Sequence, residues 1–130
     1  MRSILARVLV LVAIVVPAAG AQKYKKPIII NRTQWGGTVA VNYSGCRADN
    51  ITIGGVFPGA PKSQTGVNQT SATSSSPRGL CLIRSVNATL TGVTKPVHNY
   101  TSSGTSYYKF YIVERGDAVV VLSEAELNKK

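Results

Sequence analysis

The 130-residue sequence has one histidine, two cysteines and five acidic residues, and each scarcity excludes a kind of chemistry. His98 and two cysteines cannot fill a tetrahedral zinc site, which takes four ligands. No nucleophile-elbow glycine motif lies near His98, so a Ser-His-Asp arrangement is not expected. We therefore predict a protein that is not an enzyme and that binds no metal or cofactor.

Long apolar runs are also scarce, because the sequence has only one, at residues 8–16. This run is too short for a membrane-spanning helix, which needs about 20 residues. Arginines precede it, a proline ends it, and Ala19-Gly20-Ala21 supplies the small residues that a signal peptidase recognises. We expect residues 1–21 to be a secretory signal peptide and residues 22–130 to be one secreted, extracellular domain.

The charge is one-sided. Two arginines leave with the predicted signal peptide, which lowers the formal net charge from +10 to +8. The basic residues are scattered and form no stripe with interleaved aromatics, so nucleic acid is not an expected partner. Such a charge favours anionic surfaces, including sulfated glycans and acidic lipids. A charge excess that serves solubility is the alternative interpretation.

The two cysteines, Cys46 and Cys81, each adjoin an apolar, strand-like run. Export to an oxidising compartment favours a disulfide, and two cysteines allow one intramolecular pairing. An intermolecular bridge is the alternative. A cross-link that closes about 35 residues should stabilise the fold by roughly 4 kcal/mol.

Asparagine triplets are the strongest signal in the sequence. Ser and Thr make up 22 of the 109 residues that follow the signal peptide, so about one or two Asn-x-Ser/Thr triplets are expected by accident. We interpret the triplets as N-glycosylation sites. The alternative is that they are coincidental in a Ser/Thr-rich β protein, for instance from a bacterium that does not glycosylate them. Six of the seven asparagines begin such a triplet: Asn31, Asn42, Asn50, Asn68, Asn87 and Asn99.

A glycosylated asparagine in a strand must point to solvent, so its neighbours along the strand must point inward. Apolar residues occupy these neighbouring positions beside four of the six asparagines. The predicted inward residues are Ile28 and Ile30 near Asn31, Val39 and Val41 near Asn42, Ile51 and Ile53 near Asn50, and Ala88 and Leu90 near Asn87.

Short apolar runs separated by turn residues, without helical periodicity, predict an all-β fold. We expect a small antiparallel β-sandwich of about seven strands with one disulfide. A phase shift is needed near Ser85, because Ile83 and Val86 otherwise fall on opposite faces. Residues 58–79, rich in Ser, Thr, Gly and Pro, are predicted to be a long flexible loop, with an ordered binding loop as the alternative.

Aromatic residues and one turn suggest surfaces for binding. Strand alternation places Tyr107, Lys109 and Tyr111 on one face, and with Trp35 these residues are the predicted binding surface. The second face of a central strand is the alternative. The tripeptide Arg115-Gly116-Asp117, known from integrin ligands, is interpreted as ordinary turn chemistry.

Together these features predict a secreted, N-glycosylated binding protein whose partner is an extracellular macromolecule, a glycan or an anionic surface. The alternative is a small secreted toxin or defence protein that acts on anionic lipid membranes.

Overall fold

The computed structural model describes residues 23–56 and 68–129, which form nine strands and one short helix. The predicted signal peptide lies outside the described residues. The elements are β1 (Ile28–Asn31), β2 (Gly37–Tyr43), β3 (Asp49–Ile53), β4 (Thr70–Thr73), β5 (Ile83–Leu90), β6 (Val97–His98), β7 (Tyr100–Thr105), β8 (Lys109–Arg115), β9 (Ala118–Ser123) and α1 (Glu124–Leu127).

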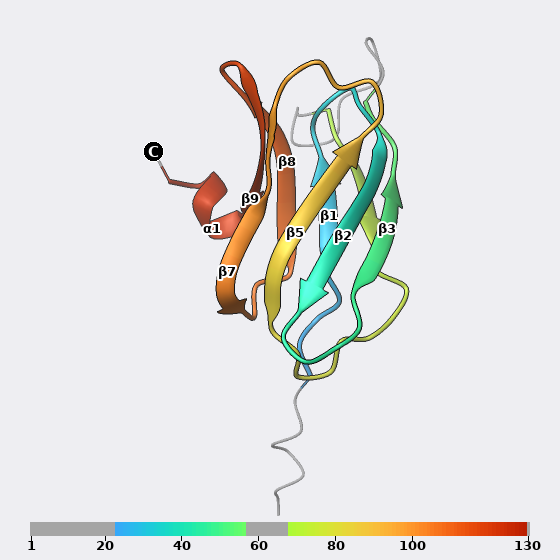
Figure 1. The fold of residues 1–130 in the computed structure, drawn as a ribbon, viewed down its shortest axis with the longest axis vertical. Helices are drawn as coiled ribbons and strands as arrows, with labels where there is room; N and C mark the ends of the chain where they lie inside the picture. The colour runs from blue at the N-terminus through green and yellow to red at the C-terminus, as the bar shows by residue number, and fades with distance from the viewer. Residues whose placement is uncertain (1–22, 57–67, 130) are drawn as a thin grey trace, which may run out of the picture.

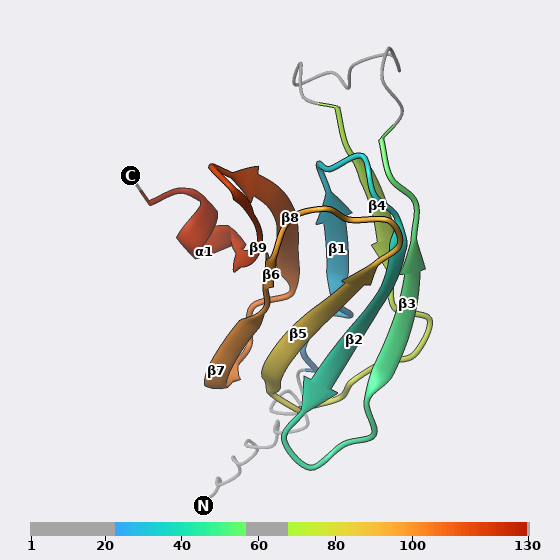
Figure 2. The same ribbon diagram turned by 45° about the horizontal axis from the view of Figure 1, so that its top comes forward.

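The strands form two sheets (Figures 1 and 2). One sheet has the order β4-β1-β8-β9-β6, and the other has the order β3-β2-β5-β7. The predicted all-β class is confirmed. The predicted number of about seven strands is not confirmed, because the described residues form nine. The predicted antiparallel arrangement is wrong for two pairs, β1–β8 and β6–β9, which are parallel. Both parallel pairs join strands that are far apart in the sequence, where the spacing of apolar runs carries no information about pairing.

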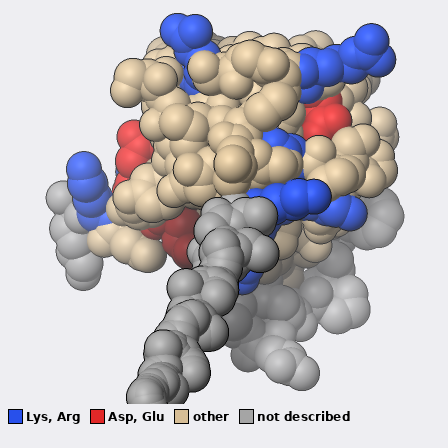
Figure 3. Space-filling view, turned by 90° about the horizontal axis from the view of Figure 1, so that it is seen from below, with Lys and Arg blue, Asp and Glu red and all other residues tan. Residues whose placement is uncertain are grey.

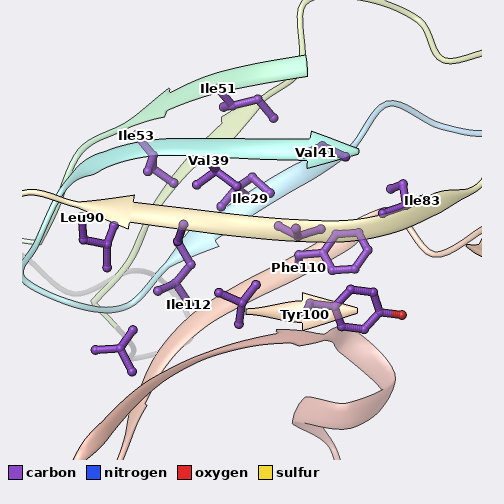
Figure 4. Close-up of a cluster of buried hydrophobic side chains, with 14 of the residues drawn as sticks. Ile29, Val39, Val41, Ile51, Ile53, Ile83, Leu90, Tyr100, Phe110 and Ile112 are labelled. Carbon is purple, nitrogen blue, oxygen red and sulfur yellow. The ribbon is translucent and has the colours of Figure 1, made fainter. Parts of the chain in front are cut away.

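The main core lies between the two sheets (Figure 4). Val39 and Val41 of β2 face Phe110 and Ile112 of β8, and all four are 0% exposed. The ring of Phe110 meets that of Tyr100 edge-on, with centroids 5.0 Å apart. Each such side chain contributes about 1.5–3 kcal/mol by leaving water, so this layer supplies the main driving force for folding.

Strand β5 changes phase near its start, as predicted. The pairing register shifts between Ile83 and Ser85, and Arg84 is exposed at the irregularity. Ile83 and Val86 can therefore both enter the core, although they are three residues apart. A bulge of this kind lets one strand present both residues to the same face.

The predicted flexible loop at 58–79 is corrected over its second half. Thr70–Thr73 forms strand β4, which pairs antiparallel with β1 and covers the edge of the sheet. Threonine favours strands and Ala72 packs on the core, so even a Ser/Thr-rich segment can pair when an open edge is available. Residues 57–67 lie outside the described part of the chain.

A second apolar cluster lies on the outer face of the five-stranded sheet, under α1. It contains Ile30, Tyr111, Val113 and Leu122, with Leu127 of α1 packed against it. A capping box at Ser123 and Glu126 begins the helix. Within the described residues, the structure contains no helix of the length and apolarity needed to cross a membrane.

Candidate functional site

One end of the molecule is held together by the side chain of Arg78, which is only 3% exposed. Its Nε donates to the carbonyl of Lys25 at 2.8 Å, and its Nη2 donates to the carbonyls of Ser106 at 2.8 Å and Tyr107 at 3.1 Å. Its Nη1 donates to the carbonyl of Cys81 at 3.4 Å. One guanidinium group therefore connects the N-terminal segment, the turn before β5 and the β7–β8 connection.

The buried charge of Arg78 is balanced by carbonyl dipoles rather than by an acid. No carboxylate of the described residues lies within salt-bridge distance of it. Burial lowers the pKa of Arg78, yet an arginine stays protonated at neutral pH. Carbonyl oxygens and the ring of Tyr24, 5.2 Å from the guanidinium carbon, replace the lost water.

The predicted Cys46–Cys81 disulfide is confirmed, and it lies at the same end. It joins the β2–β3 connection to the turn before β5, and the amide of Ser44 reinforces this link by donating to the carbonyl of Leu82 at 2.8 Å. We call the four segments gathered here (23–27, 44–48, 74–82 and 106–108) the loop end. A covalent bond and a buried cation both fix its shape.

A small pocket opens beside the disulfide. Asp49 Oδ2 accepts hydrogen bonds from the hydroxyls of Tyr43, at 2.9 Å, and Ser74. Burial, together with the hydrogen bond and negative charge of Asp49, raises the pKa of Tyr43 well above that of an ordinary tyrosine. The pocket holds about 190 Å³, which is below the usual range for small-molecule sites, so the surface of the loop end is the stronger candidate.

The surface of the loop end combines apolar and basic side chains. Leu80 is 63% exposed and Tyr107 is 49% exposed, and they are the two large hydrophobic side chains classed as exposed among the described residues. The four segments contain no acidic residue, and Asp49, which follows the segment 44–48, is half-buried against Ser74. In Figure 3, which views the molecule from below, Lys and Arg side chains are more widespread than Asp and Glu. The exposed basic residues of the segments are Lys23, Lys25, Lys26 and Arg47.

The four residues of the predicted binding surface do not form one surface. Trp35 lies at the opposite end, in the β1–β2 connection, and packs half-buried against the core. Tyr111 is only 7% exposed, whereas Tyr107 precedes β8 and lies in the loop end. The predicted alternation in β8 is confirmed for Lys109 and Tyr111, but this outer face is covered rather than open.

Tyr111 is covered by three charged side chains. The guanidinium of Arg32 lies 4.9 Å from the ring centroid, and the hydroxyl group of Tyr111 is 3.4 Å from Glu124 Oε2. Lys109 Nζ lies 3.8 Å from the same carboxylate oxygen. Burial and the negative charge of Glu124 raise the pKa of Tyr111. These contacts close the face around a small apolar cluster instead of presenting it to a partner.

Three of the triplet asparagines share the outer face of the four-stranded sheet. Ala40 of β2 pairs with Asn50 on one side and with Asn87 on the other, so these positions form one row across three strands. Asn42 is two residues further along β2 and donates to Ser85 Oγ at 2.8 Å. The inward positions predicted beside these three asparagines are confirmed, because their apolar neighbours are all buried.

The remaining predicted sites differ in their surroundings. Asn99 is exposed just before β7, and its Oδ1 accepts from the amide of Ala88 at 2.9 Å. Asn68 is half-buried just before β4. The Oδ1 of Asn68 is buried without a hydrogen-bond partner, so the exposed Asn99 is the stronger candidate for modification of the two.

The predicted exposure of Asn31 is wrong. Its side chain is 0% exposed, and it faces the main core together with Ile29, whereas Ile30 lies on the outer face. Both hydrogens of Nδ2 are used, because it donates to the carbonyls of Trp35 at 2.7 Å and Gly54 at 3.0 Å. Oδ1 accepts from the amide and the hydroxyl of Thr33. The folded domain has no room for a sugar on this nitrogen.

The tripeptide Arg115-Gly116-Asp117 lies at the exposed tip of the β8–β9 hairpin. Gly116 has a φ of +61°, a value that favours glycine, as the turn interpretation predicts. The neighbouring Glu114 forms an ion pair of 2.7 Å with Lys95. The tip is thus accounted for by turn geometry.

Sequence reasoning missed Arg78 and Leu80. Arg78 lies in the run Ser-Pro-Arg-Gly, where the composition indicates a solvated loop. The sequence pattern predicts that a strand begins at Leu80, but residues 78–80 form a turn in which Gly79 has a φ of +57°. The adjacent cysteine was the one available signal, since a disulfide holds the neighbouring chain in a defined position.

No family model, curated protein or solved structure matches the chain. The geometry alone therefore defines its class: an all-β domain of two sheets with one disulfide and a loop end built around a buried arginine.

Proposed function

We propose that this protein is a secreted, N-glycosylated binding protein that uses its loop end to attach to an anionic extracellular partner. The division of the surface carries the proposal. Asn42, Asn50 and Asn87 gather on one outer face, whereas the loop-end segments contain no triplet asparagine and no acid. One surface is suited to carry sugars and another to make contact.

The arrangement of the outer face supports glycosylation. Neighbouring strands are about 4.8 Å apart, so Asn50 and Asn87 lie roughly 10 Å from each other across Ala40. The small side chain of Ala40 leaves space between them. Asn42 donates one Nδ2 hydrogen to Ser85, and the second hydrogen is the one that a sugar would replace.

The chemistry of the loop end supports an anionic partner. Lys23, Lys25, Lys26 and Arg47 are exposed there, and the adjacent acid, Asp49, is half-buried and accepts hydrogen bonds from Tyr43 and Ser74. Lys25 lies over the ring of Tyr108, with Nζ 5.1 Å from its centroid, which keeps this cation at the surface in a defined position. Concentrated positive charge attracts anions and speeds their association.

Site mapping of the protein secreted from eukaryotic cells tests the glycosylation. Enzymatic removal of N-glycans in heavy-oxygen water marks each used asparagine. We expect an amino terminus at Gln22, no free thiol, and sugars on several of Asn42, Asn50, Asn68, Asn87 and Asn99. Unmodified asparagines throughout, or a sugar on Asn31 of the folded protein, would overturn this part.

Retention on an immobilised sulfated polysaccharide tests the anionic partner. The double variant Lys23→Gln with Lys26→Gln should elute at clearly lower salt than the unmodified protein. The matched control is Arg115→Gln with Lys129→Gln, which removes the same charge away from the loop end. Equal elution of both double variants would show that only net charge matters.

A further inference from the structure

The loop end carries a feature that attraction to polyanions does not use: two exposed apolar side chains. Building on the proposed role of this end, we infer that its partner is the surface of an anionic lipid bilayer. Leu80 and Tyr107 enter the headgroup region, while the surrounding lysines and Arg47 contact the anionic headgroups. A combination of apolar insertion and basic residues is what binding at a membrane interface requires.

Leu80 is held outward by its immediate surroundings. It lies between Arg78, whose side chain is buried, and Cys81, which is in the disulfide. The amide of Cys81 donates to the carbonyl of Arg78 at 3.0 Å, and the amide of Tyr24 donates to the carbonyl of Gly79 at 2.8 Å. The turn cannot easily fold Leu80 back onto the protein. Its exposure is therefore preorganised, and insertion costs little conformational entropy.

Tyr107 is fixed in a similar way from the β7–β8 connection. Its carbonyl accepts a hydrogen bond from Arg78 Nη2, and its amide donates to Thr105 Oγ1 at 3.1 Å. Tyrosine prefers the membrane–water interface, because the ring is apolar and the hydroxyl remains hydrated. Arg78 thus ties the loop that carries Tyr107 to the turn that carries Leu80.

A lipid surface explains more of this end than a polysaccharide does. Sulfated chains present charge and hydroxyl groups, so they would engage the lysines and leave Leu80 in water. A bilayer accepts both kinds of side chain. Each lysine near an anionic surface strengthens binding roughly fivefold, and burying a leucine side chain adds about tenfold or more. The two contributions differ in their response to salt, because screening acts only on the charges.

Co-sedimentation with vesicles tests the inference. Vesicles of phosphatidylcholine with one third phosphatidylserine should bind the mature protein, and pure phosphatidylcholine vesicles should bind it weakly. Leu80→Ser should weaken binding to the anionic vesicles about tenfold at both low and high salt. Lys23→Gln with Lys26→Gln should weaken it at low salt, whereas Arg115→Gln with Lys129→Gln should change it little.

Tryptophan quenching tests the orientation. The chain has one tryptophan, Trp35, which lies at the end opposite Leu80. Lipids brominated on the acyl chains should quench the added emission of a Leu80→Trp variant and leave the emission of the unmodified protein nearly unchanged. Because Leu80 is largely exposed, the tryptophan replacement should not disturb folding.

The outcomes separate this inference from the proposed function. Binding to anionic vesicles that Leu80→Ser weakens, with quenching at position 80, supports both. Retention on the sulfated polysaccharide without vesicle binding, or vesicle binding that Leu80→Ser leaves unchanged, overturns the lipid inference alone. Binding to neither the polysaccharide nor the vesicles overturns both.

Discussion

The two ends of the molecule are each organised around one buried polar side chain, but the two side chains differ in charge. Each end contains one buried polar residue whose side chain makes four hydrogen bonds, at least one of them to a distant segment. At the loop end this residue is Arg78, and at the opposite end it is Asn31. One residue is a cation and the other a neutral amide.

The surroundings of Asn31 and Arg78 also differ. Around Asn31 the backbone packs so closely that a Cβ at Gly36 would lie 2.8 Å from the carbonyl oxygen of Ile53. Around Arg78 the segments are joined by a disulfide and keep Leu80 and Tyr107 exposed. At the opposite end, the short amide of Asn31 and nearby glycines let the backbone segments pack closely together. At the loop end, the longer guanidinium side chain of Arg78 joins segments that stay further apart at the surface. The arrangement around Asn31 stabilises the fold, and the arrangement around Arg78 also forms a surface that a partner can contact.

Removing the disulfide should have the largest effect on this comparison. Replacing Cys46 and Cys81 with serine opens a link across 35 residues and should lower the free energy of unfolding by roughly 4 kcal/mol. The loss should be largest locally: hydrogen exchange at the amides of residues 44 and 81 should accelerate more than at those of Val56 and Thr91 at the opposite end. Hydrogen exchange by NMR measures this, and equal acceleration at both ends would contradict it.

Replacing Arg78 with methionine should have the next largest effect. The carbonyls of Lys25, Ser106 and Tyr107 lose a charged donor, so stability should fall by about 3 kcal/mol. Arg84→Met is the matched control, because Arg84 is exposed on β5, and it should change stability by less than about 0.5 kcal/mol. Urea unfolding measures both variants. Equal midpoints would show that the buried guanidinium does not hold the loop end.

The all-β class could be predicted from the sequence because it depends on local patterns, and the disulfide could be predicted because two cysteines allow only one intramolecular pairing. Alternation along β2 and β3 assigns Val39, Val41, Ile51 and Ile53 to the core without knowledge of any partner strand. The parallel pairing of β1 with β8 could not be predicted in this way, because it depends on strands about eighty residues apart.

The errors at both ends also have a physical cause. In β1 three consecutive isoleucines leave open which residues face the core. The prediction therefore relied on the triplet at Asn31, which wrongly placed this asparagine toward solvent. The buried role of Arg78 is set largely by carbonyl groups from two distant segments, 23–27 and 106–108, which no local pattern encodes. From the sequence alone, a buried polar residue that joins two segments cannot be distinguished from a polar residue exposed to solvent.

Replacing Asn31 with alanine should destabilise the opposite end by about 2 kcal/mol. The carbonyls of Trp35 and Gly54 lose their donor, and Thr33 loses its acceptor, all in a buried setting. Asn50→Ala, on the exposed outer face, should cost less than about 0.5 kcal/mol. The emission of Trp35, next to the altered site, follows urea unfolding of both variants in protein made without glycans. Similar stabilities would show that Asn31 does not organise its end as Arg78 does.

Tyr43, which precedes the loop-end segment 44–48, makes the stability of the protein depend on alkaline pH, and this should be the smallest of these effects. Because its pKa is raised in the folded state, the unfolded chain releases the proton first, near the ordinary tyrosine value of about 10. Stability should therefore be constant up to about pH 9 and fall at higher pH, by about 1 kcal/mol at pH 11. Tyr111, whose pKa is also raised, adds a decline of the same sign from the outer face.

Two phenylalanine variants separate these two contributions. Tyr43→Phe should reduce the alkaline decline in unfolding free energy between pH 9 and 11, and Tyr43→Phe with Tyr111→Phe should nearly remove it. The slope is the informative quantity, because Tyr43→Phe also loses the hydrogen bond to Asp49 and so lowers stability at every pH. If the slope of Tyr43→Phe equals that of the unmodified protein, then Tyr43 ionises as freely in the folded state as in water. The contacts of Tyr43 and Ser74 with Asp49, beside the loop end, would then be open to solvent in the folded protein.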